Sequence, residues 1–186
     1  MLILRDVAVA LLFAWLSIDA IVVFRRKSGH AENRDRSSLR LLMIAGPLVW
    51  VVSIGLAFTS MGAFQFPEGQ VIGLLVMVFG IVLRSTAIAQ LGRFHTPNVA
   101  VLEEHQVKAT GLYRHVRHPS YLGALIGFAG FGLALGNWLS LLSIVLVTPA
   151  IYLHRIREEE IALTDGLGDA YRDYCRHTKR LIPCVY

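Results

Sequence analysis

Long apolar blocks limit what this chain of 186 residues can fold into. The first three are close to the length that crosses a hydrocarbon core about 30 Å thick. The chain is 55% hydrophobic and 17% charged, with a mean hydropathy of +0.56, whereas soluble domains are nearer ~45–50% apolar and ~25% charged. We therefore predict an all-α integral membrane protein with about five transmembrane helices. The blocks run from about Leu2 to Phe24, Leu41 to Ser60, Val71 to Leu91, Ser120 to Leu135 and Trp138 to Leu153.

The last two blocks are short and predict a helical hairpin. Gly136-Asn137 separates them and is a typical turn signal. No linker or repeat suggests a second domain, so we expect residues 1–186 to form one membrane domain. Residues 1–92 would hold three N-terminal spans, and residues 93–186 would hold the polar segment, the hairpin and the C-terminal tail.

The chain after the hairpin predicts a helical tail. Leu153 to Tyr174 is typical of a helix that leaves the membrane, with an interruption around Gly166 and Gly168. Pro149, late in the fifth block, predicts a kink or an irregular turn because proline lacks a backbone N–H.

The basic residues predict the orientation. Three regions, Arg25–Arg40, Arg93–Arg117 and the tail from Arg155, hold 16 of the 18 Lys and Arg residues. In a five-span chain these regions share one side, which the positive-inside rule makes cytosolic. We therefore expect the N-terminus outside and the C-terminus in the cytosol. We therefore attribute the net charge of +5 to orientation in the membrane and to contact with anionic lipids, and not to binding of nucleic acid.

Two ionisable residues and several glycines lie inside the apolar blocks. Asp19 and Arg84 both fall near the cytosolic ends of their blocks, so they either pair or reach the interface independently. In the fourth block, the four-residue spacing of Gly123–Gly127 and Gly132–Gly136 favours close helix packing.

The polar segment before the fourth block has the most distinctive sequence. Gly111 to Gly123 reads Gly-Leu-Tyr-Arg-His-Val-Arg-His-Pro-Ser-Tyr-Leu-Gly. Pro119 suits the first turn of a helix, and it restricts His118 towards an extended conformation. We predict an extended basic strap, residues 111–118, that leads into the N-terminus of a membrane helix. Free N–H groups at such a terminus attract an anion.

Several kinds of chemistry lack a sequence signal. No pair of histidines or cysteines has zinc-motif spacing, no serine lies in a nucleophile elbow, and there is no Gly-rich phosphate loop. We therefore expect no metal. The cations, the helix N-terminus and the tail carboxylates suit a zwitterion with an α-carboxylate, an amine and a ribose. Arg117 or the N–H groups after Pro119 would take the carboxylate, and Glu159 or Glu160 the amine or a hydroxyl.

A non-enzymatic reading of the same residues stays open. The strap and tail would then form an interfacial basic belt that binds anionic lipid, with the glutamates neutralising arginines. This alternative predicts that lysine can replace the strap arginines, since only the charge would matter.

The polar residues resemble those of the isoprenylcysteine carboxyl methyltransferase family, and the chain is similar to a bacterial-type member of it. The similarity covers roughly residues 84 to 183, in order. It consists of Leu91-Gly-Arg-Phe94, His105, Gly111-Leu-Tyr113, Arg117-His-Pro-Ser-Tyr121 with Gly123, Glu159-Glu160 with Leu163, and Tyr171, Tyr174 and Arg180-Leu-Ile-Pro183.

The resemblance implies an S-adenosylmethionine-dependent methyl transfer at the cytosolic face of a membrane, the bacterial inner membrane for such a member. It implies a lipophilic acceptor that enters from the bilayer, such as the carboxylate of an isoprenoid or prenylcysteine-like compound. Together with the residue chemistry above, it predicts a cofactor pocket formed by His105, Gly111, Tyr113, Arg117, His118, Pro119, Tyr121 and Glu159.

Methyl transfer from a sulfonium is an in-line displacement, so alignment is the main task of the protein. A carboxylate acceptor needs a cation to orient it, for which Arg155 is the first candidate and Arg84 the second. An amine acceptor, as in a phospholipid N-methyltransferase, would need Glu160 or a histidine as a base. A sterol-reductase-like enzyme is a further alternative, although the sequence offers little for a dinucleotide phosphate.

Overall fold

The computed structural model describes residues 2–25, 37–64, 66–95 and 107–182. Within these residues it contains helices and no regular β-strand, which confirms the all-α prediction for this part of the chain. The α-helices are α1 (Leu2–Arg25), α2 (Ser37–Ala57), α3 (Pro67–Leu91), α4 (Pro119–Ala134), α5 (Trp138–Leu167) and α6 (Asp169–His177). Two short 3₁₀ turns are η1 (Gly92–Phe94) and η2 (Gly111–Arg114).

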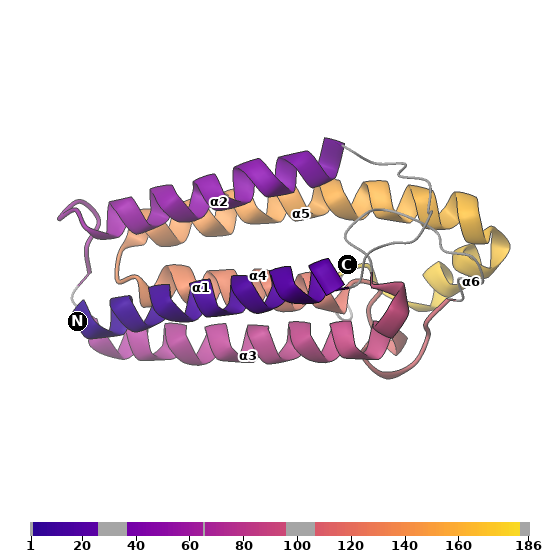
Figure 1. Cartoon of the computed structure of the whole chain (residues 1–186), viewed down its shortest axis with the longest axis horizontal. Helices are drawn as coiled ribbons and strands as arrows, with labels where there is room; N and C mark the ends of the chain where they lie inside the picture. The colour runs from indigo at the N-terminus through magenta and orange to yellow at the C-terminus, as the bar shows by residue number, and fades with distance from the viewer. Residues whose placement is uncertain (1, 26–36, 65, 96–106, 183–186) are drawn as a thin grey trace.

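Helices α1 to α5 lie side by side along the long axis of the molecule, and α6 lies at one end (Figure 1). Helix α3 packs against α4, α2 packs against α5, and α4 also contacts α5. Helix α1 lies against α3 and α4. The predicted hairpin of α4 and α5 is therefore confirmed, and it joins the two helix pairs of the bundle.

Within the part of the chain that the structure describes, three helices, α2, α3 and α5, are long and apolar enough to cross a membrane. Helix α4 has 16 residues, about 24 Å at 1.5 Å per residue, and α1 carries Arg5, Asp6 and Asp19. The number of five spans therefore stays a prediction. Helix α5 has 30 residues and is about 45 Å long, so its charged part beyond Leu153 extends past its apolar segment.

Glycines bring α3 and α4 into backbone contact. A Cβ atom on Gly80 would clash with the backbone of Gly127, and one on Gly123 would lie 2.5 Å from the backbone nitrogen of Arg84. A Cβ atom on Gly132 would instead lie 3.1 Å from Leu141 Cα in α5. The close packing predicted for these glycines is confirmed.

The turn between α4 and α5 also follows the sequence signal. Gly136 has φ +71°, a conformation that favours glycine. Asn137 caps α5 by accepting a hydrogen bond from the backbone nitrogen of Ser140 at 3.1 Å. Its side-chain amide also donates to the backbone oxygens of Leu56 and Met61, which ties the turn to the end of α2.

Two expectations for the C-terminal half had different outcomes. Helix α5 continues through Pro149 from Trp138 to Leu167, so the alternative of an irregular turn was wrong, whereas a kink at Pro149 stays a prediction. Packing of α5 against both α2 and α4 holds the helix on either side of the missing hydrogen bond. The predicted interruption is confirmed at Gly168, which has φ +57° between α5 and α6.

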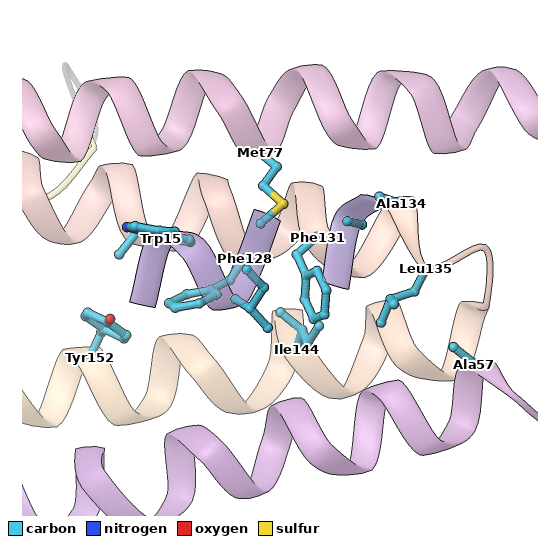
Figure 2. Packing of buried hydrophobic residues seen from close by; sticks show 12 residues of the cluster. Trp15, Ala57, Met77, Phe128, Phe131, Ala134, Leu135, Ile144 and Tyr152 are labelled. Atoms are coloured by element: carbon cyan, nitrogen blue, oxygen red, sulfur yellow. The ribbon is translucent and has the colours of Figure 1, made fainter. Parts of the chain in front are cut away.

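Aromatic side chains fill the centre of the bundle. Phe128 of α4 lies between Trp15 and Trp50, with ring centroids 4.7 Å and 5.1 Å away. Figure 2 shows Phe128 and Phe131 directed from α4 towards α5, with Trp15 beside Phe128. Helix α4 begins at the end of the bundle where α6 lies (Figure 1), so the polar residues that precede Tyr121 lie nearer to α6 than this cluster does.

Candidate active site

The basic strap pairs with the C-terminal tail. The backbone nitrogens of Arg117 and His118 donate to the carbonyl oxygens of Lys179 and Arg180, at 2.8 Å and 3.2 Å. The nitrogen of Lys179 donates back to the carbonyl oxygen of His115 at 3.3 Å. The end of the strap is therefore extended, as predicted, although its first residues form the turn η2. Strap and tail act as one structural unit.

Glu160 of α5 holds this unit to the bundle. Its carboxylate accepts a hydrogen bond from Arg117 Nε at 2.8 Å and lies 3.3 Å from His118 Nε2. Its other oxygen lies 2.6 Å from Arg180 Nη2. Although burial raises the pKa of Glu160, hydrogen bonds from His118 and Arg117 outweigh burial and lower the pKa to about 2. The side chain is therefore an anion at neutral pH.

The guanidinium of Arg117 is engaged by several groups of the protein itself. Besides Glu160, its guanidinium donates to the carbonyl oxygens of Thr178 at 2.6 Å and Cys175 at 3.2 Å. These contacts use the planar fork of an arginine, and they fix the tail in place.

The neighbouring Glu159 faces a different group. Tyr121 Oη donates to Glu159 Oε2 at 2.7 Å. The ring of Tyr121 stacks on the ring of His118, with centroids 5.6 Å apart and planes at 13°. The two adjacent glutamates of α5 therefore have different partners. Glu160 forms ion pairs with arginines, and Glu159 accepts a hydrogen bond from a tyrosine hydroxyl.

A cavity of about 70 Å³ lies beside this cluster; we call it the polar cavity. Its lining combines apolar side chains with charged groups from the strap and α5. It consists of Leu91, Phe94, Val107, Lys108, Tyr113, Arg117, His118, Glu159, Leu163, Leu167, Tyr171 and Tyr174. Typical ligand pockets have ~300–1,000 Å³, so side chains must move apart before a nucleoside-sized ligand can enter.

Three tyrosines on the wall of the polar cavity stay protonated at neutral pH. Burial raises the pKa of Tyr113 and Tyr171 well above the usual value, and that of Tyr174 to about 12. Tyr171 Oη is buried without a hydrogen-bond partner among the residues that the structure describes. This wall therefore offers a hydroxyl to a ligand.

A second cavity of about 360 Å³ lies deeper in the bundle; we call it the apolar cavity. Side chains of α1 and α2 form much of its wall, and five helices contribute to it. Its lining consists of Trp15, Leu16, Asp19, Ala20, Leu39, Leu42, Met43, Pro47, Trp50, Arg84, His95, Tyr121, Phe128, Tyr152 and Arg155. The volume falls within the range of ligand pockets.

The two candidate arginines both reach the apolar cavity. Arg84 Nε lies 2.7 Å from Asp19 Oδ2, so of the two alternatives that the sequence left open, the structure shows the pair. Arg155 is 4% exposed, and its Nη1 atom donates to Ser38 Oγ at 3.0 Å. Arg84 is therefore neutralised by a carboxylate in direct contact.

The structure brings most of the predicted site residues together. Tyr113, Arg117, His118 and Glu159 line the polar cavity, while Arg155, Arg84 and Tyr121 line the apolar cavity. Pro119 begins α4, as predicted. His105 lies outside the described residues.

Gly111 begins η2 and has φ +62°. A Cβ atom at this position would clash with the side chain of Gln90. Gln90 Oε1 accepts a hydrogen bond from the backbone nitrogen of Leu112 at 2.9 Å. The sequence interpretation missed Gln90, and it also missed Tyr152, whose apolar surroundings in the sequence gave no signal. Among the described residues, no group of three His, Cys, Asp or Glu side chains is arranged to hold a metal ion.

Comparison with known proteins decides the family. The model of the isoprenylcysteine carboxyl methyltransferase family matches residues 71–165, about half of the chain. The chain belongs to the isoprenylcysteine carboxyl methyltransferase family. The matched region begins in α3 and ends in α5, so it includes the strap, α4 and both glutamates.

Relatives in this family cover more of the chain. A probable protein-S-isoprenylcysteine O-methyltransferase of Oryza sativa subsp. indica is 28% identical over 184 residues, which cover 92% of this chain and 96% of the relative. The protein-S-isoprenylcysteine O-methyltransferase of Schizosaccharomyces pombe is 32% identical over 157 residues, with 78% and 66% covered.

A solved structure of the eukaryotic intramembrane Ras methyltransferase, isoprenylcysteine carboxyl methyltransferase, has a TM-score of 0.66 and 28% identity. The match covers 81% of this chain and 54% of that one, so this chain spans about half the length of the solved protein. The predicted family and the predicted class of function, a membrane methyltransferase, are confirmed. These relatives are eukaryotic and do not bear out the bacterial-type assignment.

Proposed function

We propose that this protein transfers a methyl group from S-adenosylmethionine to the carboxylate of an isoprenoid or prenylcysteine-like acceptor at the cytosolic face of a membrane. Its relatives are named as O-methyltransferases of protein S-isoprenylcysteine, which favours a carboxylate over the amine of a phospholipid. Membership of the family also favours an enzyme over a structural membrane protein.

The observation that carries the proposal is the position of Tyr121 between the two cavities. Its ring lines the apolar cavity, while its hydroxyl donates to Glu159 and its ring stacks on His118, both of which line the polar cavity. A donor in one cavity and an acceptor in the other would therefore meet beside this residue. Alignment of this kind is worth ~7–11 kcal/mol in favourable cases.

The residues of the polar cavity fit S-adenosylmethionine. Aliphatic and aromatic side chains suit an adenine ring, and the unpartnered Tyr171 hydroxyl suits a polar atom of the ligand. Glu159, whose Oε2 atom is engaged by Tyr121, would take the amine or a ribose hydroxyl. Bound there, the cofactor would supply an electrophilic methyl group.

The residues of the apolar cavity fit a lipophilic acid. Arg155, which lines this cavity, is the cation that we expect to orient the acceptor carboxylate. Both α1 and α2 line the cavity, but they pack against α4 and α5 respectively. A lipid would therefore enter laterally from the bilayer between α1 and α2. Surrounding hydrocarbon keeps water from competing with the acceptor.

The same proposal includes the placement in the membrane. Five spans, with the N-terminus outside and the C-terminus in the cytosol, put the strap and tail on the cytosolic side, as the basic residues favour. The bacterial inner (plasma) membrane, which the resemblance implied, stays a prediction.

Binding of radiolabelled S-adenosylmethionine to the purified full-length protein in detergent tests the proposal. We expect saturable binding, with affinity reduced at least tenfold by His118→Ala and by Glu159→Ala. Glu158→Ala and His177→Ala are matched controls, since neither residue lines the polar cavity, and they should bind as the wild type does.

A folded wild-type protein that shows no binding at high micromolar ligand would contradict the proposal. Mass spectrometry of the product then identifies the acceptor atom. A methyl ester supports the carboxylate acceptor, whereas a methylated amine would overturn it.

A further inference from the structure

Tyr152 carries an unexplained hydroxyl in the interior of the bundle. The residue is only 6% exposed, and it lines the apolar cavity. Its hydroxyl makes no hydrogen bond to any residue that the structure describes. The hydroxyl is not one of the fully buried polar atoms that lack a partner, so it keeps surface that a ligand in the cavity can reach.

Packing fixes the position of this hydroxyl. The rings of Tyr152 and Tyr121 form a T-shaped contact with centroids 5.3 Å apart, and the centroid of the Tyr152 ring lies 6.4 Å from that of Phe128. Figure 2 shows the Tyr152 side chain on the side of α5 that faces Trp15 and Phe128, which also line the cavity. Tyr152 therefore presents a polar atom to the space that an acceptor would fill.

The neighbours of Tyr152 favour an oxygen-rich ligand head. Arg155 lies one helical turn further along α5 and lines the same cavity, so the two side chains share a helix face. An arginine side chain and a tyrosine hydroxyl can both donate hydrogen bonds to a ligand oxygen, and Asp19, which also lines the cavity, is engaged by Arg84. Two donor groups of α5 therefore border the cavity, which suits an acceptor-only carboxylate.

We propose that Tyr152 determines the specificity of this site for carboxylates, by donating its hydroxyl to one oxygen of the acceptor carboxylate while Arg155 faces the other. This inference rests on the proposed function and names a group that recognises the acceptor. Tyr152 binds and orients the acid and takes no part in breaking or forming a bond.

The test measures binding without any methyl donor. The full-length protein in detergent is titrated with N-acetyl-S-farnesylcysteine and with N-acetyl-S-farnesylcysteamine, which lacks the carboxyl group. Trp15 and Trp50 line the cavity, so intrinsic fluorescence reports occupancy. Loss of one hydrogen bond to a charged group lowers the affinity by about tenfold or more. We expect Tyr152→Phe to weaken the acid by about tenfold and the cysteamine by less than about threefold.

Ser143→Ala is the matched control. It removes another hydroxyl from α5, one that is hydrogen-bonded to Ser53 and does not line the cavity. It should change neither affinity. Unchanged binding of the cysteamine also shows that the Tyr152→Phe protein is folded.

Equal weakening of both compounds, or no weakening of the acid, would overturn the role of Tyr152. The proposed function would be untouched, because cofactor binding is measured separately. If the acid does not bind to the wild type, both the role of Tyr152 and the proposed acceptor class fail.

Discussion

Replacing Glu160 by glutamine tests whether one carboxylate holds the strap and the tail to the bundle. The substitution preserves the shape of the side chain and removes the charge that Arg117, His118 and Arg180 share. The Arg117 cation of the strap, the Arg180 cation of the tail and the His118 ring would then lack their shared anion. We expect the strap–tail unit to loosen before the helices of the bundle do.

The magnitude follows from the pKa of Glu160, which lies at about 2 instead of the usual 4.5. At about 1.4 kcal/mol per pKa unit, the surroundings stabilise the charged form by roughly 3 kcal/mol. The side chain is only 11% exposed, so solvent screens the interaction weakly. Removing one partner of a buried ion pair costs about 3–5 kcal/mol, which agrees. For a chain of this size, we expect a melting temperature lower by roughly 6–12 °C.

Thermal unfolding in detergent, followed by circular dichroism, measures this difference, with Glu158→Gln as the control. Glu158 has no ion-pair partner among the described residues, so its substitution should change the melting temperature by less than about 2 °C.

The pH dependence has a definite sign. Because the pKa is lower in the folded state, the contribution of Glu160 to the free energy of unfolding is present above pH 4.5 and is lost as the pH falls towards 2. The gap between wild type and Glu160→Gln should therefore narrow from about pH 6 to about pH 3. A constant gap, or a Glu160→Gln protein as stable as Glu158→Gln, would refute the reasoning.

Two further predictions concern the membrane helices. Gly80→Ala should lower the free energy of unfolding by about 1–3 kcal/mol in thermal unfolding, because the new methyl group meets the backbone of Gly127; Gly55→Ala, which meets nothing within 4 Å, should be neutral or slightly stabilising. Asp19→Asn should destabilise by about 3–5 kcal/mol, because it leaves the Arg84 cation unmatched inside the bundle. The double variant Asp19→Leu/Arg84→Met should recover most of that loss, and no recovery would contradict the ion-pair explanation.

Most of the helical framework could be predicted from the sequence. Apolar length and turn residues act locally, so the blocks, the Gly136-Asn137 turn and the interruption at Gly168 were identified without coordinates. The sequence did not decide between a kink and a break at Pro149, because the effect of a proline depends on packing and the contacts of α5 with two other helices are invisible in the sequence.

The site could be predicted in part. Motif residues such as His118 and Glu159 were assigned to one site because their chemistry and their resemblance to a family agreed. The sequence did not separate the two glutamates by role, since adjacent residues on a helix point in directions that only the fold reveals. It treated Arg117 as an anion-binding residue, whereas the structure engages its guanidinium with Glu160 and with carbonyl groups of the tail.

The sequence by itself determined that the chain is a helical membrane protein whose basic, histidine-rich segment leads into a helix at Pro119. These features depend on the properties of neighbouring residues, and so they can be read locally. Only the tertiary structure decided that Tyr121 stands between two cavities, that Asp19 neutralises Arg84, and that the Tyr152 hydroxyl has no partner among the described residues. Each of these depends on side chains from helices far apart in the chain, whose meeting is set by packing geometry rather than by sequence distance.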